Sequence, residues 1–336
     1  MLIHVAIMKT KIVYILSSTE NDYYLEQTMI SLYSLKMHNP ESHVILIVDE
    51  RTEKSITGTR KNIMQYVDEI KVIKVPTKFN QIQTSRYLKT SLYSYIDDDY
   101  LFIDGDTIIC DNISDIDNIK NPISAVLDIH MPLSNHQRKK SIIKWANKIG
   151  WEIKNDEYYN SGVMKVNKSQ IAQILYENWH HEWLINSDKG FPRDQPSLGK
   201  VNEELGGIIS PLADIWNCQI IDNGLCFILN ANIIHYFSSA HNKTNACPYL
   251  FGNLKIYEAI RKDGMSLSSD LTEMILNAKS QFLRQTCIIS DKDIFFYESP
   301  LVVNLKKLYM NHLKFYNVIQ SILSFLKHPI EFIKRN

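Results

Sequence analysis

The first third of the chain alternates short apolar runs with stretches of helical periodicity. Residues 11–16 and 44–48 are apolar runs rich in β-branched residues, and a third run covers 70–75. Between them, 24–37 carries apolar residues three or four apart, as one helix face requires, and we expect a second helix over 55–66. Strands that are apolar throughout and separated by helices are typical of a mostly parallel sheet covered on both faces. In such α/β folds the ligand lies beyond the carboxyl ends of the strands.

Charge and cysteine content exclude several classes of protein. The chain has 37 Lys+Arg and 37 Asp+Glu, so its formal net charge is zero, which argues against a nucleic-acid partner. Its five cysteines form no Cys-x-x-Cys pair, which indicates neither a disulfide framework nor a zinc site. The apolar start precedes the first lysine, which is the wrong order for a signal peptide. No stretch reaches the roughly 20 apolar residues of a membrane span, so we expect a cytoplasmic protein.

Changes in pattern along the chain suggest three segments. Glycine and proline are few (11 and 10), and there is no repeat or low-complexity linker before about residue 240. We therefore expect a catalytic domain over 9–245. Helical patterns at 254–261 and 269–282 predict a helical C-terminal extension over 246–300, and a basic tail covers 301–336.

An Asp-x-Asp motif lies between two apolar runs. Asp104, Gly105 and Asp106 follow residues 100–103 and precede 107–109. In an extended chain alternate side chains share a face, so both carboxylates can converge on one cation, and the glycine leaves room for a ligand. Two hard oxygen ligands suit Mg²⁺ or Mn²⁺. The alternative is an Asp-Gly turn that only caps a strand.

Other polar residues stand at the ends of expected elements. Arg86 and Lys89 are three apart on an expected helix, so both can meet phosphate oxygens, or else form a solvated basic face. The polar residues Asn160-Ser161-Gly162 break the chain before a strand at 163–166. Asp194 and Gln195 begin a helix, and His235 ends a strand, a position that is more often structural than metal-binding.

Taken in order, these motifs resemble those of nucleotide-sugar glycosyltransferases of the GT-A fold. They are most similar to family 8, the galactosyltransferase and glycogenin-like enzymes, and the resemblance covers residues 9–245. It implies a Rossmann-like, mostly parallel sheet flanked by helices. It also implies transfer of galactose or glucose from a UDP-sugar to a hydroxyl of a glycan or lipid-linked glycan, with retention of anomeric configuration.

The resemblance assigns roles to individual residues. Asp104, Asp106 and His235 would hold Mn²⁺ or Mg²⁺, with the donor diphosphate completing the shell. Catalytic roles would fall to Arg86, Asp194 and Gln195, and Gln195 would face the anomeric carbon. The residues implied to bind the donor are Tyr24, Arg86, Lys89, Asp104, Asp106, Asp128, Asn160 and Lys243. Tyr24 would lie beside the base, where simple helix packing is the alternative.

The chain departs from the family pattern in two places. Family members commonly follow the late histidine with Gly and then Lys-Pro-Trp, whereas residues 236–243 contain no glycine, proline or tryptophan. The assignment of Lys243 therefore has less support than the others, and His241 is an alternative to His235 as metal ligand. The usual aspartate after the first strand is replaced by Ser18-Thr19-Glu20.

Three other functions share parts of this pattern. A haloacid-dehalogenase-type phosphatase also uses Asp-x-Asp, but near its amino terminus, and with Thr or Val where this chain has Ile108. A sugar-1-phosphate nucleotidyltransferase needs a glycine-rich loop after the first strand, and residues 17–21 contain no glycine. A non-catalytic sugar-nucleotide or glycan-binding module on the same fold stays open as the alternative.

The tail has a composition of its own. Residues 301–336 hold six basic residues and one acidic residue, interleaved with Leu, Ile, Phe and Tyr at helical spacing. Such an amphipathic basic helix suits an anionic membrane surface, whereas packing on the catalytic domain is the alternative. We expect weak peripheral contact with the cytoplasmic face of a membrane, which would suit a lipid-linked acceptor.

Overall fold

The structure is a computed structural model that describes residues 8–220, 222–236, 251, 253–282 and 295–333. The chain divides into two compact units, Met1–Arg284 and Gln285–Asn336, and each is described by itself. Helices that the sequence assigns to a C-terminal extension belong to the larger unit. The limits of that extension at residues 245 and 300 stay predictions.

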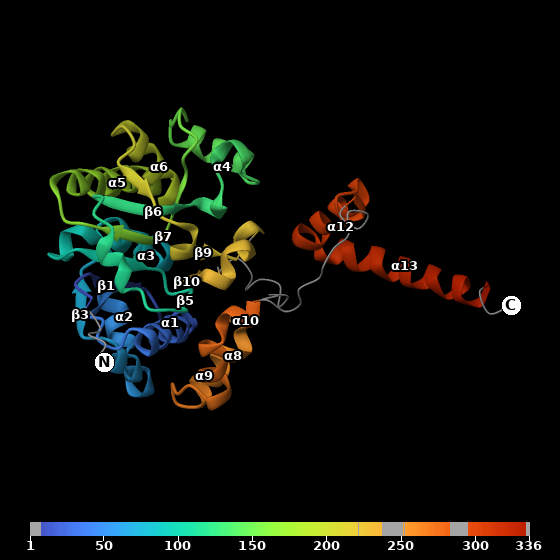
Figure 1. The fold of residues 1–336 in the computed structure, drawn as a ribbon, viewed down its shortest axis with the longest axis horizontal. Helices are drawn as coiled ribbons and strands as arrows, with labels where there is room; N and C mark the ends of the chain where they lie inside the picture. Colours follow the sequence, from blue (N-terminus) through green and yellow to red (C-terminus); the bar gives the residue numbers. More distant parts are fainter. Residues whose placement is uncertain (1–7, 221, 237–250, 252, 283–294, 334–336) are drawn as a thin grey trace, which may run out of the picture. The chain divides into compact units, whose positions relative to one another are not determined.

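The larger unit is built on a seven-stranded sheet with strand order β3-β2-β1-β4-β7-β6-β8 (Figure 1). Strand β7 is antiparallel to β4 and β6, and the other neighbouring pairs are parallel. The expected mostly parallel α/β sheet is confirmed. Its strands are β1 (Lys11–Leu16), β2 (Val44–Asp49), β3 (Glu69–Ile73), β4 (Tyr100–Ile103), β6 (Ile123–Leu127), β7 (Tyr159–Val166) and β8 (Ile209–Pro211).

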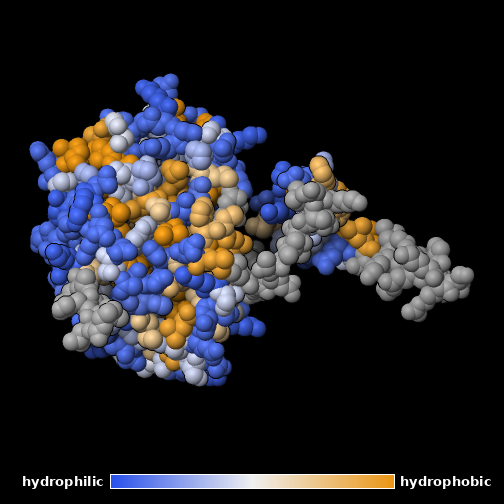
Figure 2. Space-filling view, viewed as in Figure 1, coloured by the Kyte–Doolittle hydropathy of each residue, from blue (hydrophilic) through white to orange (hydrophobic). Residues whose placement is uncertain are grey.

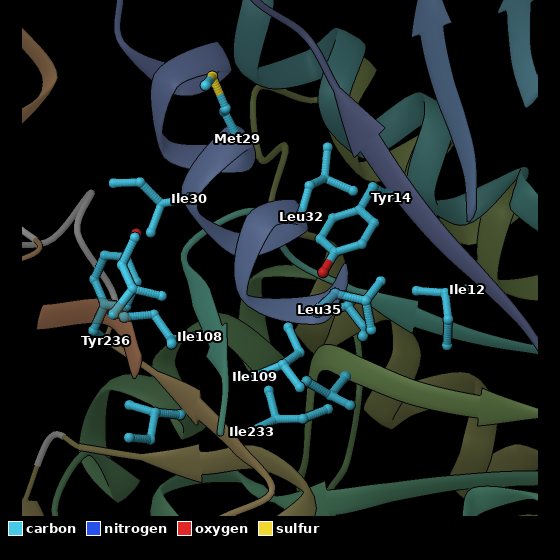
Figure 3. Close-up of a cluster of buried hydrophobic side chains, with 14 of the residues drawn as sticks. Ile12, Tyr14, Met29, Ile30, Leu32, Leu35, Ile108, Ile109, Ile233 and Tyr236 are labelled. Atoms are coloured by element: carbon cyan, nitrogen blue, oxygen red, sulfur yellow. The ribbon is translucent and has the colours of Figure 1, made fainter. Parts of the chain in front are cut away.

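Helices cover both faces of this sheet because its strands are apolar on both. Along β1, Tyr14 packs into one hydrophobic cluster and Val13 into another. Figure 3 shows part of the first cluster, where Tyr14 meets Leu32 and Leu35. The larger unit contains α1 (Tyr24–His38), α2 (Glu50–Ser55), α3 (Gln81–Thr90), α4 (Lys139–Lys148), α5 (Gln170–Asp188), α6 (Asp194–Glu204), α8 (Leu254–Lys262), α9 (Ser269–Leu276) and α10 (Ala278–Phe282).

A second, three-stranded sheet extends from the Asp-x-Asp turn. It has the order β5-β10-β9, with β5 (Thr107–Ile109), β9 (Cys218–Gln219) and β10 (Ile233–His235). Strand β10 is antiparallel to β5, and His235 lies opposite Thr107. The Tyr236 amide also donates to the Asp106 carbonyl (3.1 Å). This pairing brings the end of β10 to the carboxylates that follow β4.

Three local expectations were wrong. The helix expected over 55–66 is split into α2, capped by Asp49, and a 3₁₀ helix over Gly58–Tyr66, because Gly58 adopts a positive φ of 53° between them. The helix expected over 269–282 is interrupted at Asn277. Asn160 to Gly162 do not break the chain before β7, but lie within it. The Gly162 carbonyl accepts from the Asp104 amide just after β4, and these residues lie where the register between β6 and β7 shifts.

The smaller unit contains α12 (Pro300–Asn311) and α13 (Leu313–Ile333), which are separated at His312. No residue of α12 is buried, and Figure 2 shows hydrophobic and hydrophilic residues side by side on this unit. Within the described part of the chain, no helix is both long and apolar enough to span a membrane.

Candidate active site

A cavity of about 330 Å³ opens at the carboxyl ends of β1 and β4, where an α/β sheet is expected to bind its ligand. Its walls come from the loop after β1, the inner face of α3, the Asp-x-Asp turn, β7, the start of α6 and the end of β10. Elements far apart in the sequence therefore meet at one place. The residues predicted for the site that line the cavity are Tyr24, Arg86, Lys89, Asp104, Asp106, Asn160, Asp194, Gln195 and His235.

Three of these residues form a group that can hold a metal ion. One ligand atom from each of Asp104, Asp106 and His235 lies within 4.8 Å of the other two. His235 Nε2 is 3.2 Å from Asp106 Oδ1. Gly162 gives this group its space, because an added Cβ would collide with His235 Cε1 and lie 2.9 Å from Asp104 Oδ2. The two carboxylates are hard oxygen donors that suit Mn²⁺ or Mg²⁺, and the imidazole adds a nitrogen donor to the set.

Asn217 fixes the orientation of the His235 ring. Its amide oxygen lies 3.0 Å from His235 Nδ1, so Nδ1 donates and Nε2 is directed at Asp106. The Asn217 amide nitrogen donates in turn to Asn160 Oδ1 (3.0 Å), which also accepts from the Gly162 amide. An Nε2 that faces a carboxylate needs either a proton or a bound cation between the two groups, so the local chemistry fits a metal site.

Helix α3 supplies two cations, Arg86 and Lys89, to the described lining of the cavity. It begins with a complete capping box at Asn80 and Gln83, and Arg86 and Lys89 lie on its inner side, as their spacing predicts. Lys89 Nζ contacts both oxygens of Asp104 (3.2 and 3.1 Å) and lies 3.7 Å from Asp194. Arg86 Nε is 2.9 Å from Asp194 Oδ1. The basic pair therefore neutralises the site's own carboxylates.

Asp104 and Asp194 both lie near Lys89, but their pKa values are shifted in opposite directions. Burial raises the pKa of Asp104 above its ordinary value, even though Lys89 opposes the shift. Burial would also raise the pKa of Asp194. The charges of Arg86 and Lys89 and the hydrogen bond from the Ser161 hydroxyl lower this pKa by more than burial raises it, so the net shift is downward. The ion pair with Asp194 raises the pKa of Arg86. Asp194 is thus kept ionised beside a permanent cation.

A second polar group surrounds Asp128, behind the cavity wall. Its carboxylate accepts from the Asn160 amide (3.0 Å), contacts His136 Nε2 (3.0 Å) and is bonded by the Gln195 side chain. Burial alone would raise the pKa of Asp128, but these partners lower it below its usual range. Asp128 therefore orients two of the amides that line the cavity.

The nucleotide base of the expected UDP-sugar donor would lie at the loop after β1. Tyr24 is 38% exposed and lines the cavity, so its ring is accessible to a ligand. Gln81 donates to the Ser17 carbonyl (2.8 Å) and to Asp22 Oδ2 (2.7 Å), and Ser17 and Gln81 also line the cavity. Lys243 and His241 lie outside the described residues.

Sequence reasoning missed His136, Asn217 and Gln81. None of them belongs to a motif. Asn217, just before β9, and Gln81, in the first turn of α3, reach the site through contacts with residues far away in the sequence. His136 contacts Asp128, only eight residues before it, from a loop whose course the sequence does not indicate. Of the three, only Gln81 could have been predicted from its position, because it lies five residues before Arg86 on the helix that was expected to carry site residues.

Comparisons with known proteins point in the same direction. A family model described as Glycosyl transferase family 8 matches residues 15–243. A search of curated proteins found no match. Among solved structures, the chain is similar to the galactosyltransferase LgtC in complex with donor and acceptor sugar analogs (TM-score 0.54, 16% identity, 79% of this chain and 99% of that chain). An active-site mutant of LgtC gives similar values (TM-score 0.53, 15% identity, 78% and 99%). The expected GT-A fold is confirmed.

Proposed function

Because the chain belongs to glycosyl transferase family 8, we propose that it moves a hexose, galactose or glucose, from a UDP-sugar to a hydroxyl of a glycan acceptor. The observation that carries this proposal is the convergence of Asp104, Asp106 and His235 in a cavity lined by amides and cations. A non-catalytic binding module would have no need to combine three metal donors with Arg86 and the buried Lys89 in one cavity.

We propose that Asp104, Asp106 and His235 hold Mn²⁺ or Mg²⁺. The fit rests on the donor set, on the space left by Gly162, and on the Nε2 atom of His235 that faces a carboxylate. When bound, such an ion stabilises negative charge on a departing diphosphate. Lys89, now paired with Asp104, would then be released toward phosphate oxygens.

The other residues would bind and orient the donor sugar. Arg86 supplies a fixed positive charge whose position is set by Asp194. Gln195 lines the cavity, and its amide is bonded to the Asp128 carboxylate. An amide is a weak nucleophile, which favours front-face attack within an ion pair over a covalent intermediate. We therefore include retention of anomeric configuration in the proposal.

The most direct test is release of UDP from a panel of UDP-sugars, with Mn²⁺ or with EDTA. We expect slow hydrolysis of one donor by the wild type, and loss of about 100-fold or more with EDTA or in Asp106→Ala, as when a key electrostatic group is removed. Asp98→Ala is the matched control, because Asp98 is exposed just before β4, at the end of that strand away from the cavity. Turnover that persists in EDTA would contradict metal dependence. Absence of turnover with every UDP-sugar would contradict the proposal that the donor is a UDP-sugar.

We further propose that the acceptor is lipid-linked and that the basic tail contacts the cytoplasmic face of a membrane. Support comes from α12 and α13, where the exposed apolar residues Met310 (59%) and Phe315 (62%) stand beside exposed lysines such as Lys314. The test is co-sedimentation with phosphatidylserine vesicles. Removal of residues 301–336 should abolish binding, and unchanged binding would contradict the proposal.

A further inference from the structure

Helix α8 lies beyond the part of the chain that matches the family. The match ends at residue 243, whereas α8 spans Leu254–Lys262 and packs beside α1 (Figure 1). Tyr257 anchors this helix, because its buried ring stacks on Tyr23 and its hydroxyl accepts from the Gln27 amide (3.3 Å). The last turn of α8 therefore faces the loop between β1 and α1.

One side chain of that turn, Arg261, makes several contacts with the loop. Its Nη1 donates to the Glu20 carbonyl (2.8 Å), and its Nη2 donates to the Asp22 carbonyl. Its Nε donates to Glu26 Oε1 (2.7 Å), and the guanidinium lies 4.4 Å from the centre of the Tyr23 ring. A planar guanidinium can satisfy a carboxylate and two carbonyls together, which a lysine ammonium cannot do with the same geometry.

Glu26 makes this contact costly to remove. Its side chain is fully buried, and its Oε2 has no hydrogen-bond partner among the described residues. Arg60 Nη1 is 3.9 Å from Glu26 Oε1, whereas Arg261 Nη2 is only 2.6 Å away. Arg261 is therefore the closer counter-charge, and burying a carboxylate without one is strongly unfavourable.

The loop that Arg261 holds is a wall of the cavity. The Asp22 carboxylate accepts from the Ser18 hydroxyl (2.7 Å), the Thr19 amide (2.7 Å) and the Gln81 amide (2.7 Å). Gln81 also bonds the Ser17 carbonyl, and Ser17, Gln81 and Tyr24 line the cavity. A continuous set of hydrogen bonds thus connects α8 to the expected base end of the donor site.

We propose that Arg261 is a positioning residue that sets the affinity for the nucleotide by ordering the loop over residues 17–24. The segment after the family match is then part of the nucleotide site. This inference rests on the proposed function, because it takes the nucleotide to lie against Ser17, Tyr24 and Gln81.

The test compares full-length wild type with Arg261→Lys and Lys262→Ala. Lys262 is the matched control, because it is exposed on the same turn of α8 and its side chain forms no hydrogen bond or ion pair with the loop among the residues that the structure describes. Calorimetry with Mn²⁺ should give a Kd for UDP about tenfold higher in Arg261→Lys, the effect of losing a charge-assisted hydrogen bond. Its KM for the donor should rise with little change in kcat, and amide exchange over 18–24 should become faster. Lys262→Ala should match the wild type.

A further variant separates ordering of the loop from general loss of stability. Glu26→Gln/Arg261→Lys removes the buried charge, yet still lacks the bonds to the Glu20 and Asp22 carbonyls. It should fold and still bind UDP weakly, so recovery of wild-type affinity would overturn the inference. Equal affinity and equal exchange in wild type and Arg261→Lys would also overturn it. A wild type that binds no UDP would instead overturn the proposed function, and with it the role in nucleotide affinity.

Discussion

At the residue scale, the close approach of Asp104 and His235 depends on Gly162, which has no side chain. Gly162 lies on β7, and its carbonyl accepts from the Asp104 amide (2.7 Å), so the backbones of β4 and β7 are in direct contact there. Any Cβ at this point would enter the space between His235 and Asp104. Asp104 and His235 can come this close only because residue 162 is glycine.

Gly162→Ala should therefore weaken Mn²⁺ binding by at least about tenfold, because displacing one ligand of a metal site typically has this effect. Gly199→Ala is the matched control, since its added Cβ would lie 2.6 Å from Trp151 Cη2, in the hydrophobic packing of α6. That control should lower thermal stability and leave Mn²⁺ affinity intact. If Gly162→Ala binds Mn²⁺ as tightly as the wild type, the space at residue 162 is not needed for metal binding.

His136 should determine how the site responds to acid. Burial would raise the pKa of Asp128, and the hydrogen bond from His136 is the strongest of the effects that lower it. In His136→Ala the pKa of Asp128 should rise, because the carboxylate loses a hydrogen bond that favours its ionised form. Because the ionised carboxylate orients Asn160, the acid limb of kcat/KM should then move to higher pH.

The pH profile of donor turnover checks this expectation. His180→Ala is the control, because His180 is a partly buried histidine that contacts Thr90 and Tyr87 rather than Asp128, and burial lowers its pKa to about 4. An unchanged acid limb in His136→Ala would show that Asp128 is not held ionised through this contact.

Residues at the ends of apolar strands could be proposed for the site from sequence, because their place in the strand indicates where their side chains lie. Asp104 and Asp106 follow the apolar strand β4, so strand geometry places both carboxylates at its carboxyl end. His235 ends another apolar strand, β10, and the pairing of β10 with β5 brings it to them. Asn217 has no such signal, because its contact with His235 depends on the pairing of β9 with β10. A partner defined only by tertiary contact cannot be found from spacing.

At the element scale, the start of α3 positions both cations of the site. Asn80 accepts from the Gln83 amide (2.9 Å), and the Gln83 side chain accepts in return from the Asn80 amide (3.1 Å). The first turn of α3 also carries Gln81, which bonds the loop after β1. The N-terminal cap therefore fixes the helix and the cavity wall together.

Asn80→Ala should lower the free energy of unfolding by about 1 kcal/mol, the usual effect of removing an N-cap. Asn80→Ser retains a capping oxygen and should recover most of this loss. Chemical denaturation measures both variants. Equal stability of Asn80→Ala and wild type would indicate that the capping box does not hold α3 in place.

Element boundaries were predicted best where apolar periodicity is strong. The limits of β1, α1 and β2 agree closely with the expected ranges. In these elements the spacing of apolar residues determines both whether the segment is a helix or a strand and where it begins and ends. The helix expected over 55–66 failed because backbone conformation at Gly58 outweighs side-chain pattern. Strand β7 was expected to start at 163, since polar residues in a central strand resemble a loop when their partners are unknown.

At the scale of the whole molecule, α8 to α10 complete the hydrophobic core of the larger unit. Tyr257, Ile260, Ile275 and Phe282 are buried in the same cluster as α1 and β10. The sequence indicated helices in this region, but it gave no means of placing them on α1, because a single amphipathic helix does not identify its partner. The larger unit therefore extends past the family match.

A chain of residues 1–284 should melt within about 2 °C of the full protein and turn over the donor equally well, because none of the side chains described after residue 284 is buried. A chain of residues 1–250 should lose cooperative melting, since it exposes the cluster that α8 to α10 cover. Differential scanning calorimetry distinguishes the two. Equal melting of both chains would show that these helices are not part of the core.

The central claim is that Asp104, Asp106 and His235 bind one metal ion together with the donor diphosphate. Pulsed electron paramagnetic resonance of Mn²⁺ tests this most directly, because it detects nitrogen and phosphorus nuclei coupled to the ion. We predict one bound Mn²⁺ per chain with a nitrogen coupling that is lost in His235→Gln, and a phosphorus coupling that appears when UDP is added. A wild-type signal without nitrogen coupling, or one unchanged in His235→Gln, would contradict the account.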